Sequence, residues 1–256
     1  MPTYAVLGAT GQVGTSLLTV LLNQQHPDLK INAYCRSASK LHNALLQTQD
    51  NPAVTVYPGA ITDTALLAST LRGTQAAFLA VAATQNEPGC SIAQDTAHAV
   101  IAALELLRKE GEKKLPLLVV LSSASIDRRF IRNIPWPLHS ILYTALSSLY
   151  RDLELAEAYL LSHSNWVHAV FVKPAALTHD VQGGHKLSVD ESKSPLSFLD
   201  LAAGMVEVAG GGSDEWAGRS VSVLPMAKKV AFPWDAPVAL GKGLLLHFLP
   251  WLWGWI

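Results

Sequence analysis

Charge is scarce in this sequence. Of its 256 residues 15% are charged, whereas an average soluble domain carries about 25%. The 19 basic and 20 acidic residues leave a net charge of -1. Nucleic-acid-binding proteins normally have a basic excess, so this balance excludes an electrostatic nucleic-acid binder. The hydrophobic fraction of 50% instead predicts a large apolar interior.

Cysteine, metal-ligand spacing and long apolar runs are also lacking. The two cysteines, Cys35 and Cys90, are too few for a disulfide scaffold and suit a reducing compartment, so we interpret both as inert. No histidine spacing such as His-Glu-x-x-His occurs, and His179 with His185 does not make a site, so no metal is expected. Without a signal-peptide pattern or about 18 consecutive apolar residues, we expect a cytoplasmic protein with no transmembrane segment.

Short apolar runs alternate with segments of helix length. Strands are expected at residues 4–7, 31–35, 54–57, 76–81, 117–121 and 166–172. Helices are expected at residues 12–24, 38–49, 63–71, 91–111 and 138–162. Apolar strands separated by helices require a parallel sheet that is covered on both faces. Because crossovers are right-handed, the sequence predicts an α/β, doubly wound Rossmann fold.

The alternation loosens after about residue 174. Short strands are expected at 185–189 and 220–224, and a helix at 198–209. We therefore predict a Rossmann domain over residues 1–174 and a small substrate-binding lobe over 175–256. The lobe would cover the carboxyl ends of the strands, where such folds bind ligands, and would belong to the same compact unit.

A glycine motif follows the first expected strand and opens the first expected helix. Gly8 allows a tight turn, Gly11 allows the backbone to approach a pyrophosphate, and Gly14 allows close packing of helix on strand. Free N–H groups at the helix start and the helix dipole favour an anion there. A turn that binds nothing is the alternative, but the strand–turn–helix context favours a dinucleotide.

The end of the second expected strand indicates which dinucleotide. An NAD site would show Asp or Glu about 20 residues beyond the glycines. This chain has Arg36 and Ser37 there, followed by Lys40. Arg36 can pair with a 2′-phosphate and stack on adenine, and Lys40 adds a second cation. Unless these are ordinary surface cations, the cofactor is NADP(H).

These residues resemble the atypical short-chain dehydrogenase/reductases with an NmrA-like Rossmann domain. The matching segments are residues 8–14, 35–37, 59–63, 120–123, 173–174 and 198–202. Within that family the chain is most similar to the fungal averufin-oxidase-like oxidoreductases, which tailor aromatic polyketides.

The resemblance implies that residues at matching positions contact the cofactor. At residue 60 this chain has Ala60, where the family often has Asp. The implied contacts are Thr10, Gln12 and Val13 to the pyrophosphate; Ala60 and Ile61 to adenine; Ala80 and Val81 to the ribose; Ser122 and Ser123 to the nicotinamide side; and Pro174, Ala175 and Leu177 to the carboxamide.

The Tyr-x-x-x-Lys pair that is usual in short-chain dehydrogenases is missing. Neither Tyr143 nor Tyr150 is followed four residues later by lysine, and no lysine occurs between residues 114 and 173. Hydride transfer needs close positioning of the substrate, because the cofactor carries the difficult chemistry. The proton would then come from Ser123, Ser125, Tyr150 or water.

The loop after the fifth expected strand adds further candidates. Asp127 is a candidate general acid or base, and Arg128, Arg129 or Arg132 could steady a phenolate or enolate unless these arginines face water. Lys173, at the end of the sixth expected strand, would reach the same site or satisfy nearby backbone carbonyls.

Three functional hypotheses follow. The first is an NADP(H)-dependent oxidoreductase acting on a bulky, apolar, aromatic or polyketide-like small molecule. The missing Tyr-Lys pair motivates the second, a redox-neutral isomerase or cyclase that retains NADP. The third is a non-catalytic nicotinamide sensor of the NmrA type. We expect a monomer or homodimer.

The last 23 residues hold four of the seven tryptophans. Their rings would form an apolar wall over a polycyclic substrate. Alternatively they would touch a membrane surface, although Lys242 is the single cation from residue 236 onward. Packing against the body of the protein or a dimer contact is the plainest interpretation.

Overall fold

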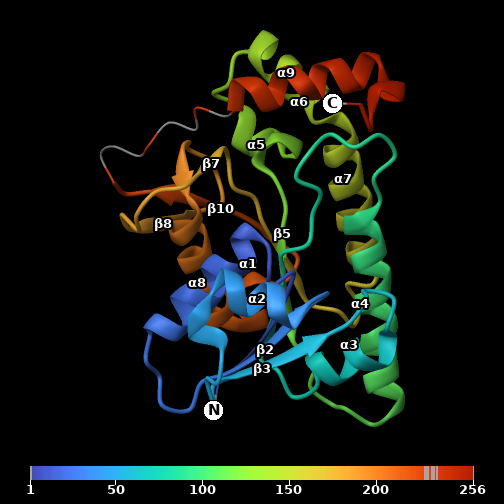
Figure 1. The fold of residues 1–256 in the computed structure, drawn as a ribbon, viewed down its shortest axis with the longest axis vertical. Coiled ribbons are helices and arrows are strands. Elements are labelled where there is room, and N and C mark those ends of the chain that lie inside the picture. Colours follow the sequence, from blue (N-terminus) through green and yellow to red (C-terminus); the bar gives the residue numbers. More distant parts are fainter. Residues whose placement is uncertain (1, 228–230, 232–233, 235, 256) are drawn as a thin grey trace.

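An eight-stranded sheet forms the centre of the computed structural model, which describes residues 2–227, 231, 234 and 236–255 (Figure 1). Its strand order is β3-β2-β1-β4-β5-β6-β10-β8, and β8 runs antiparallel to β10 while the other pairs are parallel. The strands are β1 (Thr3–Leu7), β2 (Lys30–Cys35), β3 (Val54–Pro58), β4 (Ala76–Leu79), β5 (Leu117–Leu121), β6 (Ala169–Val172), β8 (His185–Ser188) and β10 (Ser220–Pro225). Two short strands, β7 (Leu177–Thr178) and β9 (Leu196–Ser197), pair separately.

Helices cover both faces of this sheet. On one face α1 (Gln12–Asn23) packs against α8 (Phe198–Trp216). On the other face α4 (Ile92–Lys109) lies between α3 (Thr64–Leu71) and α7 (Ser147–Ser162). The strand order reverses between β1 and β4. The glycine loop that follows β1 therefore lies at the point where doubly wound sheets bind ligands. The predicted doubly wound Rossmann fold is confirmed.

The burial pattern explains why these segments form these elements. Ala5, Val6 and Leu7 are completely buried, as a strand with helices on both faces requires. The buried positions of α4 recur every three or four residues, among them Val100 and Leu104, so that one stripe of the helix meets the sheet.

Two expected helices are interrupted. The segment 138–162 divides into α6 (Trp136–Ala145) and α7, because Leu146 leaves helical geometry at φ -124° and ψ 24°. The segment 38–49 divides into α2 (Ala38–Ala44) and the short 3-10 helix η1 (Leu46–Thr48), with Leu45 extended between them. The break at Leu146 directs α6 away from the sheet and above its carboxyl edge (Figure 1).

The chain after residue 174 serves two purposes. Helix α8 and strand β10 complete the main layers, since β10 lies between β6 and β8. In contrast, α9 (Ala236–Phe248) packs on α6 beyond the carboxyl ends of the strands, next to η3 (Pro250–Leu252) (Figure 1). Also on that side are η2 (Ala124–Ile126) and α5 (Arg128–Ile131). Within the described part of the chain, no helix combines the length and apolarity needed to cross a bilayer.

Candidate active site

The loop after β1 brings three backbones close together. Gly8 has a φ of +81°, and a Cβ there would lie 2.4 Å from the carbonyl oxygen of Ala80. A Cβ on Gly14 would lie 2.1 Å from the carbonyl oxygen of Gly8. Only glycine fits either position without moving the backbone. The first and third glycines therefore have the roles that the sequence predicts, a tight turn and close packing of α1.

The start of α1 is open towards the same edge of the sheet. Gly11 precedes the helix, and no side chain caps its first N–H groups, which suits a pyrophosphate. Val13 is buried in the core, so it would reach a phosphate through its backbone. The Gln12 side-chain nitrogen lies 3.0 Å from Nε2 of His179, which follows β7. The C-terminal part thus borders the loop, and Thr10 is half-buried within it.

The ends of β2 and β3 form the next part of the site. Arg36 and Lys40 are exposed, and neither joins an ion pair with any described residue. The Ser37 hydroxyl accepts a hydrogen bond from the Lys40 backbone N–H at 3.2 Å and so begins α2. The phenol of Tyr34 donates to the carbonyl of Ala60 at 2.7 Å, which fixes the turn that carries Ile61. The two cations are therefore free to meet a phosphate.

A cavity of about 430 Å³ lies at the carboxyl ends of β5 and β6. This volume falls within the range of about 300–1,000 Å³ that is usual for ligand pockets. Its walls are mostly apolar and include Leu142, Leu146, Leu149, Leu153, Pro174, Ala175, Ala176, Leu177, Ala236, Ala239 and Leu240. The expected nicotinamide-side residues Pro174, Ala175, Leu177 and Ser122 all line it, whereas Ala80 and Val81 follow β4 beside the glycine loop.

Polar side chains gather at one wall of this cavity. Ser123, Ser125 and Tyr150 line it, and the Tyr150 phenol donates a hydrogen bond to the Ser125 hydroxyl at 3.1 Å. The ring of His139 lies 3.1 Å from the Ser125 carbonyl. Burial raises the pKa of Tyr150, while Ser125 and Ser123 act in the opposite direction. The phenol therefore stays protonated at neutral pH, which suits a proton donor.

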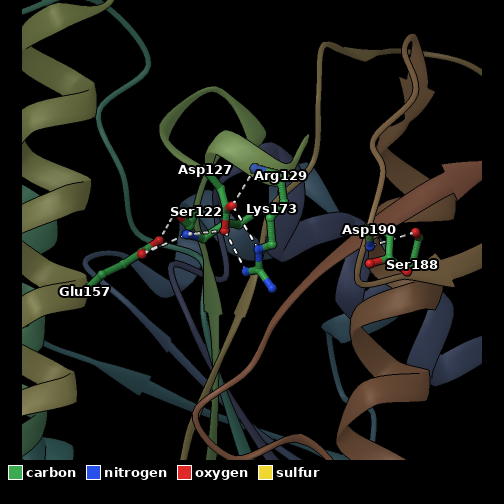
Figure 2. Close-up of polar contacts among 7 residues, drawn as sticks. All are labelled: Ser122, Asp127, Arg129, Glu157, Lys173, Ser188 and Asp190. Atoms are coloured by element: carbon green, nitrogen blue, oxygen red, sulfur yellow. Dashed lines mark hydrogen bonds and ion pairs between the residues drawn. The ribbon is translucent and has the colours of Figure 1, made fainter. Parts of the chain in front are cut away.

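A buried ion cluster lies behind this wall (Figure 2). The Lys173 ammonium is 2.9 Å from Oε2 of Glu157 and 3.4 Å from Oδ2 of Asp127. The Ser122 hydroxyl donates to the other Glu157 oxygen, and Arg129 holds Asp127 through its side chain at 2.8 Å. Since Lys173 is only 5% exposed, both carboxylates are needed to stabilise its charge.

The cluster keeps Asp127 ionised. Burial alone would raise the pKa of this carboxyl, but hydrogen bonds from Arg129 and the charges of Lys173 and Arg129 lower it from 3.8 to about 2. A carboxyl with a pKa of about 2 has no proton to donate near neutrality, and its carboxylate is a weak base. Its geometry therefore supports an anchoring function more than proton exchange.

The remaining candidates lie at the margin. Arg128 and Arg132 are exposed and line no part of the cavity, and Arg129 contacts Asp127. Burial raises the pKa of both thiols, that of Cys90 to about 11, so neither forms a reactive thiolate at neutral pH.

The C-terminal segment covers the cavity with a helix rather than with tryptophan rings. Ala239 and Leu240 of α9 line the cavity, while the side chains of Trp251, Trp253 and Trp255 are exposed. The buried amide of Asn86 fixes α9 by donating to the Gly243 carbonyl at 3.2 Å. These rings follow α9, which ends at Phe248, and none of them lines the cavity.

Sequence reasoning missed three residues of this site. Glu157 lies on a helix and Asn86 lies in a loop, and neither position carries a sequence motif. Only the folding of the chain around the sheet brings these two residues close to the candidate active site. His179 was considered solely as a metal ligand, whereas it contacts Gln12. The apolar periodicity of residues 138–162 predicted the helical segment that forms the cavity wall. It did not predict the break at Leu146, which creates that wall.

The fold and the glycine loop define an NAD(P)H-binding Rossmann protein, and comparisons with known proteins agree. A family profile described as NAD(P)H-binding matches residues 8–210. A short-chain dehydrogenase/reductase from Veillonella parvula, solved in complex with NADP, has a similar fold with a TM-score of 0.65 at 17% identity, covering 90% of this chain and 99% of that one.

Sequence relatives are much closer. Oxidoreductase stcQ of Emericella nidulans is 48% identical over 98% of this chain and 93% of its own length. Oxidoreductase aflX of Aspergillus parasiticus is 46% identical over 98% of this chain and 94% of its own length. The chain therefore belongs to the NAD(P)H-binding family of atypical short-chain dehydrogenase/reductases, within a group of fungal oxidoreductases. The resemblance inferred from the motifs is confirmed.

Proposed function

We propose that this protein is an NADP(H)-dependent oxidoreductase that acts on a bulky, apolar, aromatic or polyketide-like small molecule. The observation that carries this proposal is the cavity of about 430 Å³, which is mostly apolar and has one wall of serines and Tyr150. Such a combination holds a large apolar body and directs one oxygen at hydrogen-bond donors. The fungal oxidoreductases at 48% and 46% identity support the same reaction class.

The preference for NADP(H) rests on the end of β2. Arg36 is exposed and forms no ion pair among the described residues, so its guanidinium is available for a 2′-phosphate. No carboxylate occupies the position that would bind the 2′-hydroxyl of NAD. The close approaches at Gly8 and Gly14 and the uncapped start of α1 fit the rest of the dinucleotide.

The bound cofactor supplies or accepts a hydride. The chain itself orients the substrate and moves one proton. In the reducing direction the Ser125 hydroxyl donates a proton to the substrate oxygen and recovers it from the Tyr150 phenol, 3.1 Å away, and the phenolate takes a proton from water that enters the cavity when the product leaves. Ser123 adds a donor to the same oxygen, and Lys173 positions the serine loop through Glu157 and Ser122.

A redox-neutral isomerase or cyclase is the second candidate. The ion pairs of Lys173 favour this candidate. The Lys173 ammonium is bound to Glu157 and Asp127, and it does not lower the pKa of a tyrosine as the lysine of a Tyr-x-x-x-Lys pair would. In that case the cofactor would remain unchanged while Tyr150 and Ser125 transfer protons within one substrate.

Titration of the purified protein with NADPH and NADH, followed by tryptophan fluorescence, tests the cofactor. Tight binding of NADPH and much weaker binding of NADH is expected. Turnover is then measured with a polycyclic aromatic quinone such as anthraquinone, by nicotinamide absorbance and by product analysis together. Consumption of one NADPH for each product supports the oxidoreductase. Product without NADPH consumption supports the second candidate, and failure to bind either nucleotide contradicts both.

A further inference from the structure

One end of the molecule presents an unusually apolar outer surface. We define the aromatic cap as α6, α9 and the following residues 249–255, which lie together beyond the carboxyl ends of the strands (Figure 1). The described residues include sixteen exposed large hydrophobic side chains. Nine of them belong to the cap: Trp136, Leu138, Ile141, Val238, Leu245, Phe248, Trp251, Trp253 and Trp255. A monomer surrounded by water rarely gathers so many in one place.

The inner side of the cap contacts the rest of the protein, whereas the outer side is exposed. Towards the protein, the buried amide of Asn86 donates to the Gly243 carbonyl at 3.2 Å, the Ser147 hydroxyl lies 2.7 Å from Nδ1 of His247, and Leu246 is 3% exposed. The outer rings make no such contacts: Trp251 is 68% exposed and Trp255 is 86% exposed. The cap is therefore fixed to the body through one side only.

The cap segments carry exposed cations and no carboxylate side chain of their own; the neighbouring Glu154 of α7 accepts a hydrogen bond from Tyr143 of α6 and lies 3.8 Å from Arg151. Residues 128–150 and 236–256 contain no aspartate and no glutamate, although the whole chain has 20 acidic residues. Arg128, Arg132 and Lys242 are exposed in these segments, and none of them joins an ion pair with a described residue. A second copy of this chain would bring the same cations against them. An anionic lipid surface complements them.

We propose that the aromatic cap docks on an anionic lipid bilayer. Indole rings are favoured at the boundary between headgroups and acyl chains, and nearby Arg and Lys side chains add attraction to anionic lipids. Docking itself does not depend on the proposed reaction.

Docking would also place the cavity next to the membrane. Leu142 of α6 and Ala236, Ala239 and Leu240 of α9 line the cavity from the same helices that form the cap. An apolar substrate dissolved in the bilayer would then enter without crossing water. This consequence, unlike docking, rests on the proposed function.

Co-sedimentation with vesicles tests the proposal. Full-length protein is mixed with vesicles of phosphatidylcholine, with or without phosphatidylserine, and the bound fraction is measured. We expect binding that phosphatidylserine strengthens. The triple variant Trp251→Ser, Trp253→Ser and Trp255→Ser should bind at least about tenfold more weakly. The matched control, Leu46→Ser with Leu161→Ser, removes exposed apolar side chains elsewhere and should bind like the original protein.

A second set of variants tests the charges. Replacing Arg128, Arg132 and Lys242 by Gln should weaken binding to phosphatidylserine vesicles at least about tenfold and leave phosphatidylcholine binding little changed. Replacing Lys109, Lys113 and Lys114 by Gln serves as the control. Unchanged NADPH affinity verifies that each variant is folded. Absence of vesicle binding, or equal binding by the tryptophan variant, overturns the proposal. So does a concentration-dependent dimer that this variant dissociates while vesicle binding is absent.

Discussion

The Lys173 ammonium lies 2.9 Å from the Glu157 carboxylate, although Lys173 directly follows β6 and Glu157 lies in the middle of α7. Lys173 is 5% exposed and Glu157 is 13% exposed, so water contributes little to their solvation. The pair connects α7 to the loop that carries Ser123 and Ser125, because Glu157 also accepts a hydrogen bond from Ser122. The cavity wall is thereby tied to the sheet.

This pair should behave as one thermodynamic unit. Lys173→Met leaves the Glu157 carboxylate without its cation, while Asp127 keeps Arg129, and should lower the free energy of unfolding by about 3 kcal/mol. Glu157→Gln should cost less, because Asp127 still faces the lysine. The double variant should be destabilised by less than the sum of the two effects, as measured by urea unfolding. Strict additivity would show that the two side chains are not energetically coupled.

Arg36 should determine the choice of cofactor. Arg36→Gln removes a charge-assisted contact to the 2′-phosphate and should weaken NADPH binding by about ten- to a hundredfold. NADH affinity should change little, since NADH has no phosphate at that position. Fluorescence titration of both nucleotides measures the effect, with Lys113→Gln as an exposed cation outside the site. An equal loss of NADH affinity would contradict this role.

Tyr150 should matter for turnover and not for cofactor binding. Tyr150→Phe removes the phenol that donates to Ser125, and kcat should fall by about 10² to 10⁴-fold. The dissociation constant for NADPH should remain unchanged. Tyr143→Phe is the matched control, because its hydroxyl donates to Glu154 and does not line the cavity. If both variants lose activity equally, the proton comes from elsewhere.

Asp127 should make stability depend on pH in the acid range. Its pKa is about 2 in the folded protein and 3.8 without the fold's contacts, so its ionised form stabilises the native state fully above pH 4. That contribution disappears as the pH falls from about 4 to about 2. The difference in unfolding free energy between the original protein and Asp127→Asn should therefore shrink over this interval in urea titrations. A constant difference would mean that the folded and unfolded pKa values are equal.

Gly243 and Gly241 offer a test of the helix that covers the cavity. A Cβ on Gly243 meets the Ala145 carbonyl, so Gly243→Ala should displace α9, cost about 1–3 kcal/mol of stability and raise KM. A Cβ on Gly241 meets nothing within 4 Å, so Gly241→Ala should leave KM unchanged and stabilise the helix by about 0.5–1 kcal/mol. Identical KM values for the two variants would show that α9 does not define the cavity.

Local patterns predicted the parts of this protein that depend on neighbouring residues. The motif at Gly8, Gly11 and Gly14 is readable because a strand, a turn and a helix follow one another within a few residues. Burial on both faces likewise made the strands readable as apolar runs. These signals suffice for the fold, since a parallel sheet has few compatible topologies.

The parts that depend on distant residues were not predictable in this way. Nothing in the sequence around Glu157 indicates that it faces Lys173, because the contact requires α7 to pack beside β6. The break at Leu146 occurs without proline or glycine, so periodicity continued across it. The sequence likewise left open whether the tryptophans cover the substrate, contact a membrane or pack against the protein, whereas Ala236, Ala239 and Leu240 of α9 line the cavity.

The position of β10 has a consequence for how the polypeptide is made. Strand β6 obtains its second neighbour only when residues 220–225 have left the ribosome, because β10 lies between β6 and β8. Helix α8, which covers α1, also emerges late. A nascent chain that already carries the whole glycine loop thus still exposes one apolar face and one unpaired strand edge. The nucleotide site therefore acquires its rigid support only after residues 198–225 have been synthesised.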